Sequence, residues 1–328
     1  MTSSVVKSFG LLASVAALAV IWTSDGRAAD LADPLPILDT PIPAEQWAQW
    51  EATIVPIYGW VPGMSGDLGV LGVQASINVT PIQIFRNLDQ VFEVLDGYYM
   101  GSGLIRYDRI GFFYDAVHYR VGSVQEFAGE RTGTLEIMGP GFGPVQGADL
   151  TLTGEARVDG IVDVAFSHTI ATFAATYRAY KTPRSHLDVF AGVRVTDVEL
   201  KIGVVTDLSV AVEANLSFGP ISKTFGAAGG TKVNAVAKDE DTWVDPLIGA
   251  RGRSKLDENW FVTGWAMVGG FGIQSRFLYD VMGGVGYEWE NGVSAFGGYR
   301  VSHTDYEDGV FKWDLTMHGP LLGVSAKF

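Results

Sequence analysis

One histidine and three charged residues near the C-terminus have the side chains that acid–base chemistry requires. His303 and Asp305 are two residues apart, so in a β-strand they lie on the same face. A hairpin turn near Asp308-Gly309 would place Asp314 opposite His303 and Lys312 opposite Asp305. A histidine beside a carboxylate can act as a general base. We expect the group to face outward, where polar residues are ordinary, and therefore predict no enzyme and no catalytic residue.

Patterns for other chemistry are absent from the sequence. There are no cysteines, and the five histidines include no HxxxH pair, so neither thiolates nor paired imidazoles can form a metal site. No serine lies in a G-x-S-x-G turn. We therefore predict no metal and no cofactor.

Alternation with a period of two identifies the elements that position the charged residues. Over residues 187–196, aliphatic residues alternate with a row that contains Asp188 and Arg194, which is typical of a strand between lipid and a polar interior. Residues 277–289, 293–301 and 322–328 show similar outward rows. In the first strand, the apolar even-numbered positions from Trp50 to Trp60 predict a lipid-facing row. The segment 260–272 is apolar at both parities, so its facing stays open.

These segments predict an all-β fold, an antiparallel up-and-down transmembrane β-barrel. We expect ten strands, with eight or twelve as alternatives. The strands are expected near residues 48–61, 98–108, 109–121, 161–180, 187–203, 242–254, 260–272, 276–290, 292–306 and 311–328. Short links alternate with long ones at 62–96, 122–160 and 203–242, which predicts short periplasmic turns and long extracellular loops. Within these loops, residues 150–158 and 208–218 alternate regularly and predict strands that rise above the membrane.

One short helix is expected in the first extracellular loop. Thr80 suits an N-cap and Pro81 the first helical position, and apolar residues recur at helical spacing up to Leu95. The helix could act as a lid or plug that narrows the lumen, or merely pack the loops together.

The N-terminal region predicts export. Residues 1–28 read as a signal peptide, with Lys7 before a short apolar stretch and small residues at the cleavage site. Residues 29–46 form a Pro-rich periplasmic lead-in, and residues 47–328 form the barrel. The whole chain has a net charge of -14, which argues against nucleic acid as a partner.

Four segments carry a resemblance. They are Tyr58–Gly66 (YGWVPGMSG), Val244–Arg251 (VDPLIGAR), Gly284–Tyr287 (GVGY) and Gly319–Gly323 (GPLLG). In this order and spacing they resemble an uncharacterised family of Gram-negative outer-membrane β-barrel proteins, small barrels like OmpA and the opacity proteins. The resemblance implies a place in the outer membrane and supplies no catalytic residues.

The inward rows define the candidate functional residues, a possible charge network in the lumen. Its members are Glu51, Arg106, Arg178, Asp188, Arg194, Asp245, Arg251, Arg253, Asp280, Glu288 and Arg300. They could pair across the barrel and fill it, or line a narrow pore that attracts anions.

We therefore expect a structural or surface-interacting protein of the cell envelope, with a narrow porin-like pore for small solutes as a possibility. The alternative is a lipid- or peptide-cleaving barrel enzyme that uses the His303 group. The expected partners are outer-membrane lipid, lipopolysaccharide and, through Phe328, the barrel-assembly machinery. The expected oligomeric state is a monomer.

Overall fold

The computed structural model describes residues 49–70, 73–138, 148–208, 212–218, 221–227 and 231–328. All of them belong to one compact unit that extends from Thr40 to Phe328. The predicted signal peptide and the lead-in up to residue 46 lie outside the described residues.

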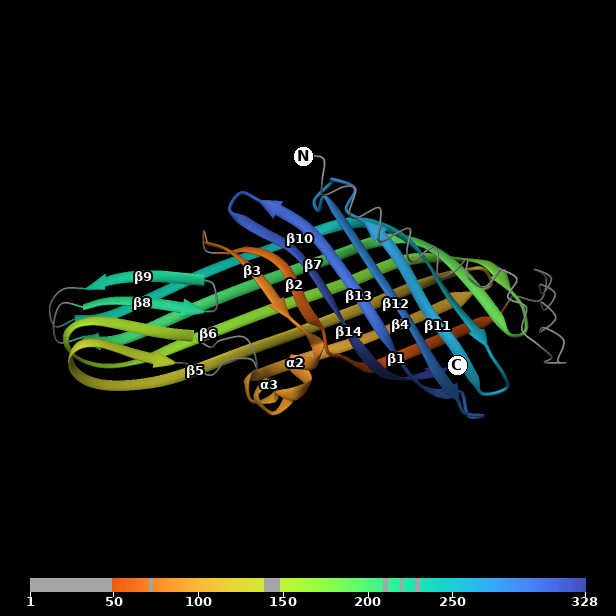
Figure 1. Ribbon diagram of the computed structural model, residues 1–328. Coiled ribbons are helices and arrows are strands. Elements are labelled where there is room, and N and C mark those ends of the chain that lie inside the picture. Colours follow the sequence, from red (N-terminus) through yellow and green to blue (C-terminus); the bar gives the residue numbers. More distant parts are fainter. Residues whose placement is uncertain (1–48, 71–72, 139–147, 209–211, 219–220, 228–230) are drawn as a thin grey trace, which may run out of the picture. The chain divides into compact units, whose positions relative to one another are not determined.

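The described residues form a closed antiparallel barrel of ten strands (Figure 1), which confirms the predicted fold class and strand number. Its strands, in order around the ring, are β1 (Trp50–Trp60), β4 (Leu95–Tyr107), β5 (Ile110–Met138), β6 (Ala148–Lys181), β7 (Ser185–Leu208), β10 (Thr231–Lys255), β11 (Trp260–Gly269), β12 (Phe277–Glu288), β13 (Val293–Asp308) and β14 (Phe311–Lys327). β14 pairs with β1 and closes the ring. A closed ring leaves neither of these strands with an unpaired edge where they meet.

Alternate residues of the strands face lipid and lumen. In β7, Val189 and Val193 are exposed whereas Asp188 and Arg194 are buried. Exposed apolar side chains recur around the ring, for example at Ile105 and Ile248. An apolar outer surface around a polar interior is the arrangement of transmembrane β-barrels. Neither described helix is long and apolar enough to span a membrane.

Exposed aromatic residues gather at one end of the barrel. We call it the short-turn end, because the brief connections at 108–109, 182–184, 256–259 and 289–292 lie there. Trp50 packs against Tyr107, and Trp260 against Tyr287. Such girdles mark the boundary between lipid and water.

The hairpin registers agree with the sequence in one case and differ in the next. Between β12 and β13, Tyr287 pairs with Ala295 and Val285 with Gly297, which is the register that a hairpin turn centred on Asn291 predicts from the sequence. Between β13 and β14, the register differs by two residues from the predicted one. The turn is centred on Gly309 and Val310, not on Asp308-Gly309, and Gly309 supplies the positive φ of 58° that such a tight turn needs.

The first strand does not present one continuous lipid-facing row. Ile54 pairs with Ala326 and Ile57 with Val324, so β1 contains one residue more than β14 over this stretch. Pro56, which has no N–H to donate, lies in this bulge. The extra residue inverts the facing, and Tyr58 and Trp60 are buried at 3% exposure each instead of lipid-facing as predicted.

Four neighbouring strands are much longer than a membrane requires. β5, β6, β7 and β10 contain 29, 34, 24 and 25 residues, whereas about 9–11 residues cross a bilayer. Much of the segments 122–160 and 203–242 is therefore strand. β8 (Val212–Phe218) pairs with β6 and with β9 (Ile221–Ala227). The expectation of strands within residues 150–158 and 208–218 is thus met by β6, by the end of β7 and by β8.

The first long connection contains a hairpin and helical turns. The hairpin of β2 (Gly63–Val70) and β3 (Val73–Val79) continues the sheet, because β2 pairs with the part of β14 that β1 does not reach. The predicted helix follows as α2 (Pro81–Arg86) and α3 (Leu88–Val94), which are separated at Asn87.

The start of α2 has the predicted cap. The backbone N–H of Thr80 donates to the Gln83 side chain at 2.8 Å. No residue of α2 is buried, and Ile82 and Phe85 are 61% and 49% exposed. α2 therefore does not plug the lumen, which leaves the plug hypothesis without support.

Candidate functional site

The centre of the lumen is occupied by an ion-pair network around Arg300 of β13. Its Nη2 donates to Asp115 of β5 and to Asp280 of β12, each at 2.7 Å, and its Nη1 donates to Tyr58 of β1 at 2.7 Å. The side chains of Arg300, Asp115 and Asp280 are 0% exposed. One guanidinium thus joins strands from different parts of the ring, and we call these residues, with Arg194, the central network.

Asp280 connects this cluster to two further strands, β7 and β11. It accepts from Nη2 of Arg194 on β7 at 2.8 Å and from the indole N–H of Trp265 on β11 at 2.9 Å. Arg194 also donates to the hydroxyl of Thr172 at 3.1 Å. These bonds place Trp265 inside the barrel. Met267 is also buried, at 1% exposure, so the face of β11 that the sequence left open is settled.

A second cluster of ion pairs lies nearer the short-turn end. Asp188 accepts from Arg106 at 2.5 Å and from Nε of Arg178 at 2.6 Å. Glu51 accepts from Lys181 at 2.6 Å and from Nη1 of Arg178 at 3.2 Å. Arg178 therefore bridges two carboxylates, as a buried cation requires.

Two further predicted residues pair with each other. Arg253 donates to Glu288, and its Cζ lies 3.5 Å from the ring centroid of Phe261. Lys255 is 3.7 Å from the same carboxylate. Asp245 has a different role, because it accepts from the backbone N–H and the hydroxyl of Ser275 and so anchors the β11–β12 connection.

Arg251 differs from the other predicted arginines. Its Cζ lies 4.8 Å from the ring centroid of Phe113, which is an attractive cation–π distance. It has no ion pair with any described residue, and its Nη1 is buried without a hydrogen-bond partner. Asp188 lies opposite it on β7 but is paired with Arg106 and Arg178.

An aromatic layer also fills the lumen, beyond the central network from the short-turn end. Trp243 of β10 stacks on Tyr306 of β13 with ring centroids 4.0 Å apart and planes 2° apart. Trp313 of β14 lies 6.5 Å from Trp243 and 4.8 Å from His168 of β6. Trp243, Trp313 and His168 are at most 3% exposed. These rings bring together strands from opposite sides of the ring.

Sequence reasoning missed two members of the central network, Asp115 and Tyr58, and also Trp265, which donates to Asp280. Asp115 lies two residues from Phe113 and Val117, both buried, so the alternation of β5 itself was the available signal. The bulge in β1 concealed the inward facing of Tyr58. Trp265 was concealed because β11 is apolar on both faces.

The His303 group does not form the predicted arrangement. Because the register is two residues away from the predicted one, His303 pairs with Thr316 and its Nδ1 lies 3.1 Å from the Thr316 hydroxyl. Asp305, not His303, pairs with Asp314. His303 stacks on Tyr279 with centroids 5.2 Å apart, on the outward face as expected. Among the described residues, no group of three potential ligands could hold a metal ion.

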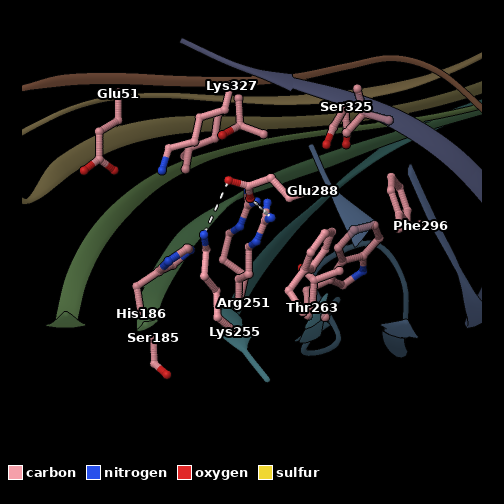
Figure 2. A pocket seen from close by; sticks show the side chains of 18 of the residues that line it. Glu51, Ser185, His186, Arg251, Lys255, Thr263, Glu288, Phe296, Ser325 and Lys327 are labelled. Carbon is pink, nitrogen blue, oxygen red and sulfur yellow. Dashed lines mark hydrogen bonds and ion pairs between the residues drawn. The ribbon is translucent and has the colours of Figure 1, made fainter. Parts of the chain in front are cut away.

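A cavity of about 170 Å³ extends from Tyr58 of the central network past the second cluster toward the short-turn end. We call it the vestibule. Figure 2 shows Glu51 and Lys327 on one wall and His186, Arg251 and Lys255 on the other. The wall carries seven lysines and arginines and two glutamates. The lining cations are Arg178, Lys181, Arg184, Arg251, Arg253, Lys255 and Lys327.

Comparison with known proteins finds similar solved structures but no family. No protein-family model matches the chain, and no curated protein matches it. Among solved structures, it is similar to the outer membrane protease OmpT from Escherichia coli, with 10% identity, a TM-score of 0.39, and coverage of 86% of this chain and 98% of that one. It is also similar to the translocator domain of the autotransporter NalP from Neisseria meningitidis, with 10% identity, a TM-score of 0.23, and coverage of 87% and 91%. A FadL homologue from Pseudomonas aeruginosa gives 10% identity, a TM-score of 0.25, and coverage of 85% and 90%.

Proposed function

We propose that this protein is an outer-membrane β-barrel with a sealed lumen, which serves as a rigid base for a β-structure that extends beyond the membrane. The apolar outer surface and the aromatic girdle support the membrane location. The even strand number and the placement of the short turns support an orientation with the short-turn end in the periplasm.

The central network is the observation that carries the sealed lumen. An open water-filled pore would leave its lining charges accessible to solvent, whereas Arg300, Asp115 and Asp280 are 0% exposed. Arg300 of β13 binds Asp115 across the barrel on β5 and Asp280 on the neighbouring strand β12. An ion would have to break these pairs to pass.

The aromatic layer adds a second barrier. Trp243 is 1% exposed and Trp313 is 3% exposed, and rings stacked at 4.0 Å leave no room for water between them. Two successive closed layers favour a structural barrel over a narrow pore.

The extended strands support a surface role. At about 3.3 Å per residue, the 34 residues of β6 are several times longer than the apolar part of a membrane. β8 pairs with β6, and β9 pairs with β8, which widens this sheet. A sheet of this size is a surface on which an external partner or lipopolysaccharide could bind. We propose no enzymatic role, and a monomer that inserts with the help of the barrel-assembly machinery.

Single-channel recording tests the sealed lumen. The refolded full chain is inserted into a planar bilayer, after a heat-modifiable shift on a gel has shown that it is folded. We expect no steady openings. A variant that should leak is Arg300→Ala combined with Asp280→Ala and Trp243→Ala, because it removes side chains from both layers. Steady conductance by the unmodified protein would contradict the proposal.

A further inference from the structure

The vestibule has an excess of positive charge that the carboxylates of its wall do not balance. Arg184 apart, six lysines and arginines face two glutamates. Both glutamates are already engaged, since Glu51 binds Arg178 and Lys181, and Glu288 lies beside Arg253 and Lys255. Asp188, which lies opposite Arg251 on β7, is also paired twice. The excess positive charge of the wall therefore makes the interior of the vestibule electropositive.

Arg251 is the cation that lacks a counter-ion most clearly. The Phe113 ring supports one side of its guanidinium group, and the group lies in the wall of the cavity. Its buried Nη1 has no hydrogen-bond acceptor among the described residues. A buried cationic donor without an acceptor is costly, and an anion bound to the accessible part of the same guanidinium group would offset that cost.

The shape of the wall favours an oxyanion over a halide. A planar guanidinium group presents parallel N–H donors that match two oxygens of a phosphate or carboxylate. Lys255 and Lys327, on different strands of the wall (Figure 2), can add point charges from other directions. Several converging cations favour an anion with two charges over one with a single charge.

We propose that the vestibule is a binding site for a small doubly charged oxyanion of the phosphate class, with Arg251 as its principal ligand. The central network closes the vestibule on its inner side, so the site is a dead end that is reached from the short-turn end. This inference goes beyond the sealed lumen and does not depend on it, because an open pore would leave the same charges in place.

Isothermal titration calorimetry tests the site. The full chain, refolded in uncharged detergent micelles, is titrated with inorganic phosphate at pH 7.5 and low salt. We expect saturable binding of one phosphate per chain. Arg251→Gln should weaken it by about tenfold or more, because a charge-assisted hydrogen bond is lost.

Arg276→Gln is the matched control. Arg276 is 62% exposed, lies in the β11–β12 connection away from the vestibule, and pairs with Glu307 and Asp305. The same loss of charge there should change phosphate affinity by less than about twofold, because salt screens a distant exposed charge. Equal weakening by both variants would overturn the proposal in favour of non-specific attraction.

Two further measurements keep the test decisive. If Arg251→Gln does not fold, Arg251→Lys keeps the charge without the planar fork and should still bind phosphate more weakly than the unmodified chain. Competition by phosphatidic acid added to the micelles, whose phosphate is a monoester, would identify a lipid headgroup as the source of the phosphate, and competition by glycerol phosphate alone a soluble one. Absence of saturable phosphate binding by the unmodified chain would overturn the proposal.

Discussion

Arg300 and Arg251 both lie on the inner wall of the barrel, and their surroundings are opposite. Arg300 has two carboxylates and a phenol within hydrogen-bond distance. Arg251 has the face of one aromatic ring and no acceptor among the described residues. The same residue type therefore fills the lumen in one place and leaves a charged cavity in the other. The surrounding strands account for this difference. They supply Asp115 and Asp280 to Arg300, whereas the carboxylates near Arg251 are already paired with other cations.

This difference distinguishes a charged residue that stabilises the fold from one that is available to bind a ligand. A buried pair stabilises little compared with a hydrophobic replacement, but removal of one partner leaves the other buried and unpaired. Loss of Arg300 should therefore be severe, and loss of Arg251 should be mild. Four variants test this comparison.

The largest effect is expected for Arg300→Leu. The substitution leaves Asp115 and Asp280 without this cation, and we expect a loss of about 3–5 kcal/mol in the free energy of unfolding. Urea unfolding in micelles, followed by tryptophan fluorescence, measures it. Arg276→Leu, which removes an exposed cation, is the control. If Arg300→Leu lowers the free energy of unfolding by less than about 1 kcal/mol, which is the range of a surface ion pair, the proposed difference between Arg300 and Arg251 is contradicted.

Gly249→Val tests the wall beside Arg251 without a change of charge. A Cβ atom at Gly249 would lie 2.5 Å from Cζ of Phe190 and 2.6 Å from the carbonyl oxygen of Ala266. We expect the crowding to cost about 1–3 kcal/mol, measured by the same unfolding. Gly283→Val is the control, because no atom lies within 4 Å of a Cβ at that position. Equal losses in both variants would show that β-propensity, not crowding, decides.

Arg251→Met should change the free energy of unfolding by less than about 1 kcal/mol in phosphate-free buffer, and could increase it, because a charge without a counter-ion is replaced by an apolar side chain of similar length. Thermal unfolding on a heat-modifiability gel would detect either direction. A loss as large as that of Arg300→Leu would show that Arg251 has a structural partner and would remove the contrast.

The smallest effect is expected at the exposed pair of Asp67 and Lys312. The hydrogen bond from Ser76, with that from Lys312, lowers the pKa of Asp67 below its ordinary value of 3.8. A lowered pKa in the folded state stabilises the fold above the unfolded-state pKa, and this contribution is lost as the pH falls through the folded-state value. Asp67→Asn should therefore flatten the pH dependence of stability below about pH 4, measured as the urea midpoint at several pH values. If the variant and the unmodified chain show the same pH dependence of the urea midpoint, the pair of Asp67 and Lys312 does not contribute to stability.

Alternation in the sequence predicted most of the fold. Rows such as that of Val189 and Val193 identify the lipid-facing side, because a strand with one face in lipid must alternate. The wrong predictions occur where a single residue shifts the alternation of a strand or the position of a turn. The bulge at Pro56 inverted Tyr58 and Trp60, and the turn at Gly309 moved the register of β14 by two residues. Neither shift changes the number of strands.

The sequence was sufficient to predict which charged residues face the lumen, but not which of them form ion pairs with one another. Period two places Asp280 and Arg300 on the inner faces of neighbouring strands, whereas their contacts with Asp115 and Arg194 depend on how the strands curve around the ring. Asp115 comes from a strand 185 residues away from Arg300, and nothing local in the sequence indicates that contact. The vestibule was equally hidden, because a cavity arises from what distant side chains leave empty.

The seam between β1 and β14 has a consequence for how the chain folds. Thr53 pairs with Lys327, and Ala52 exchanges two backbone hydrogen bonds with Phe328 at 3.0 and 2.8 Å. Contacts between residues so far apart in the sequence form slowly, because the entropy of closing the loop is lost before they stabilise the fold. The ring therefore closes late in folding, when β1 pairs with β14. Until then each of these strands presents an unpaired edge, to which another chain could bind. Speed of closure, more than the strength of any pair within the lumen, would then decide whether a newly made chain becomes a barrel or an aggregate.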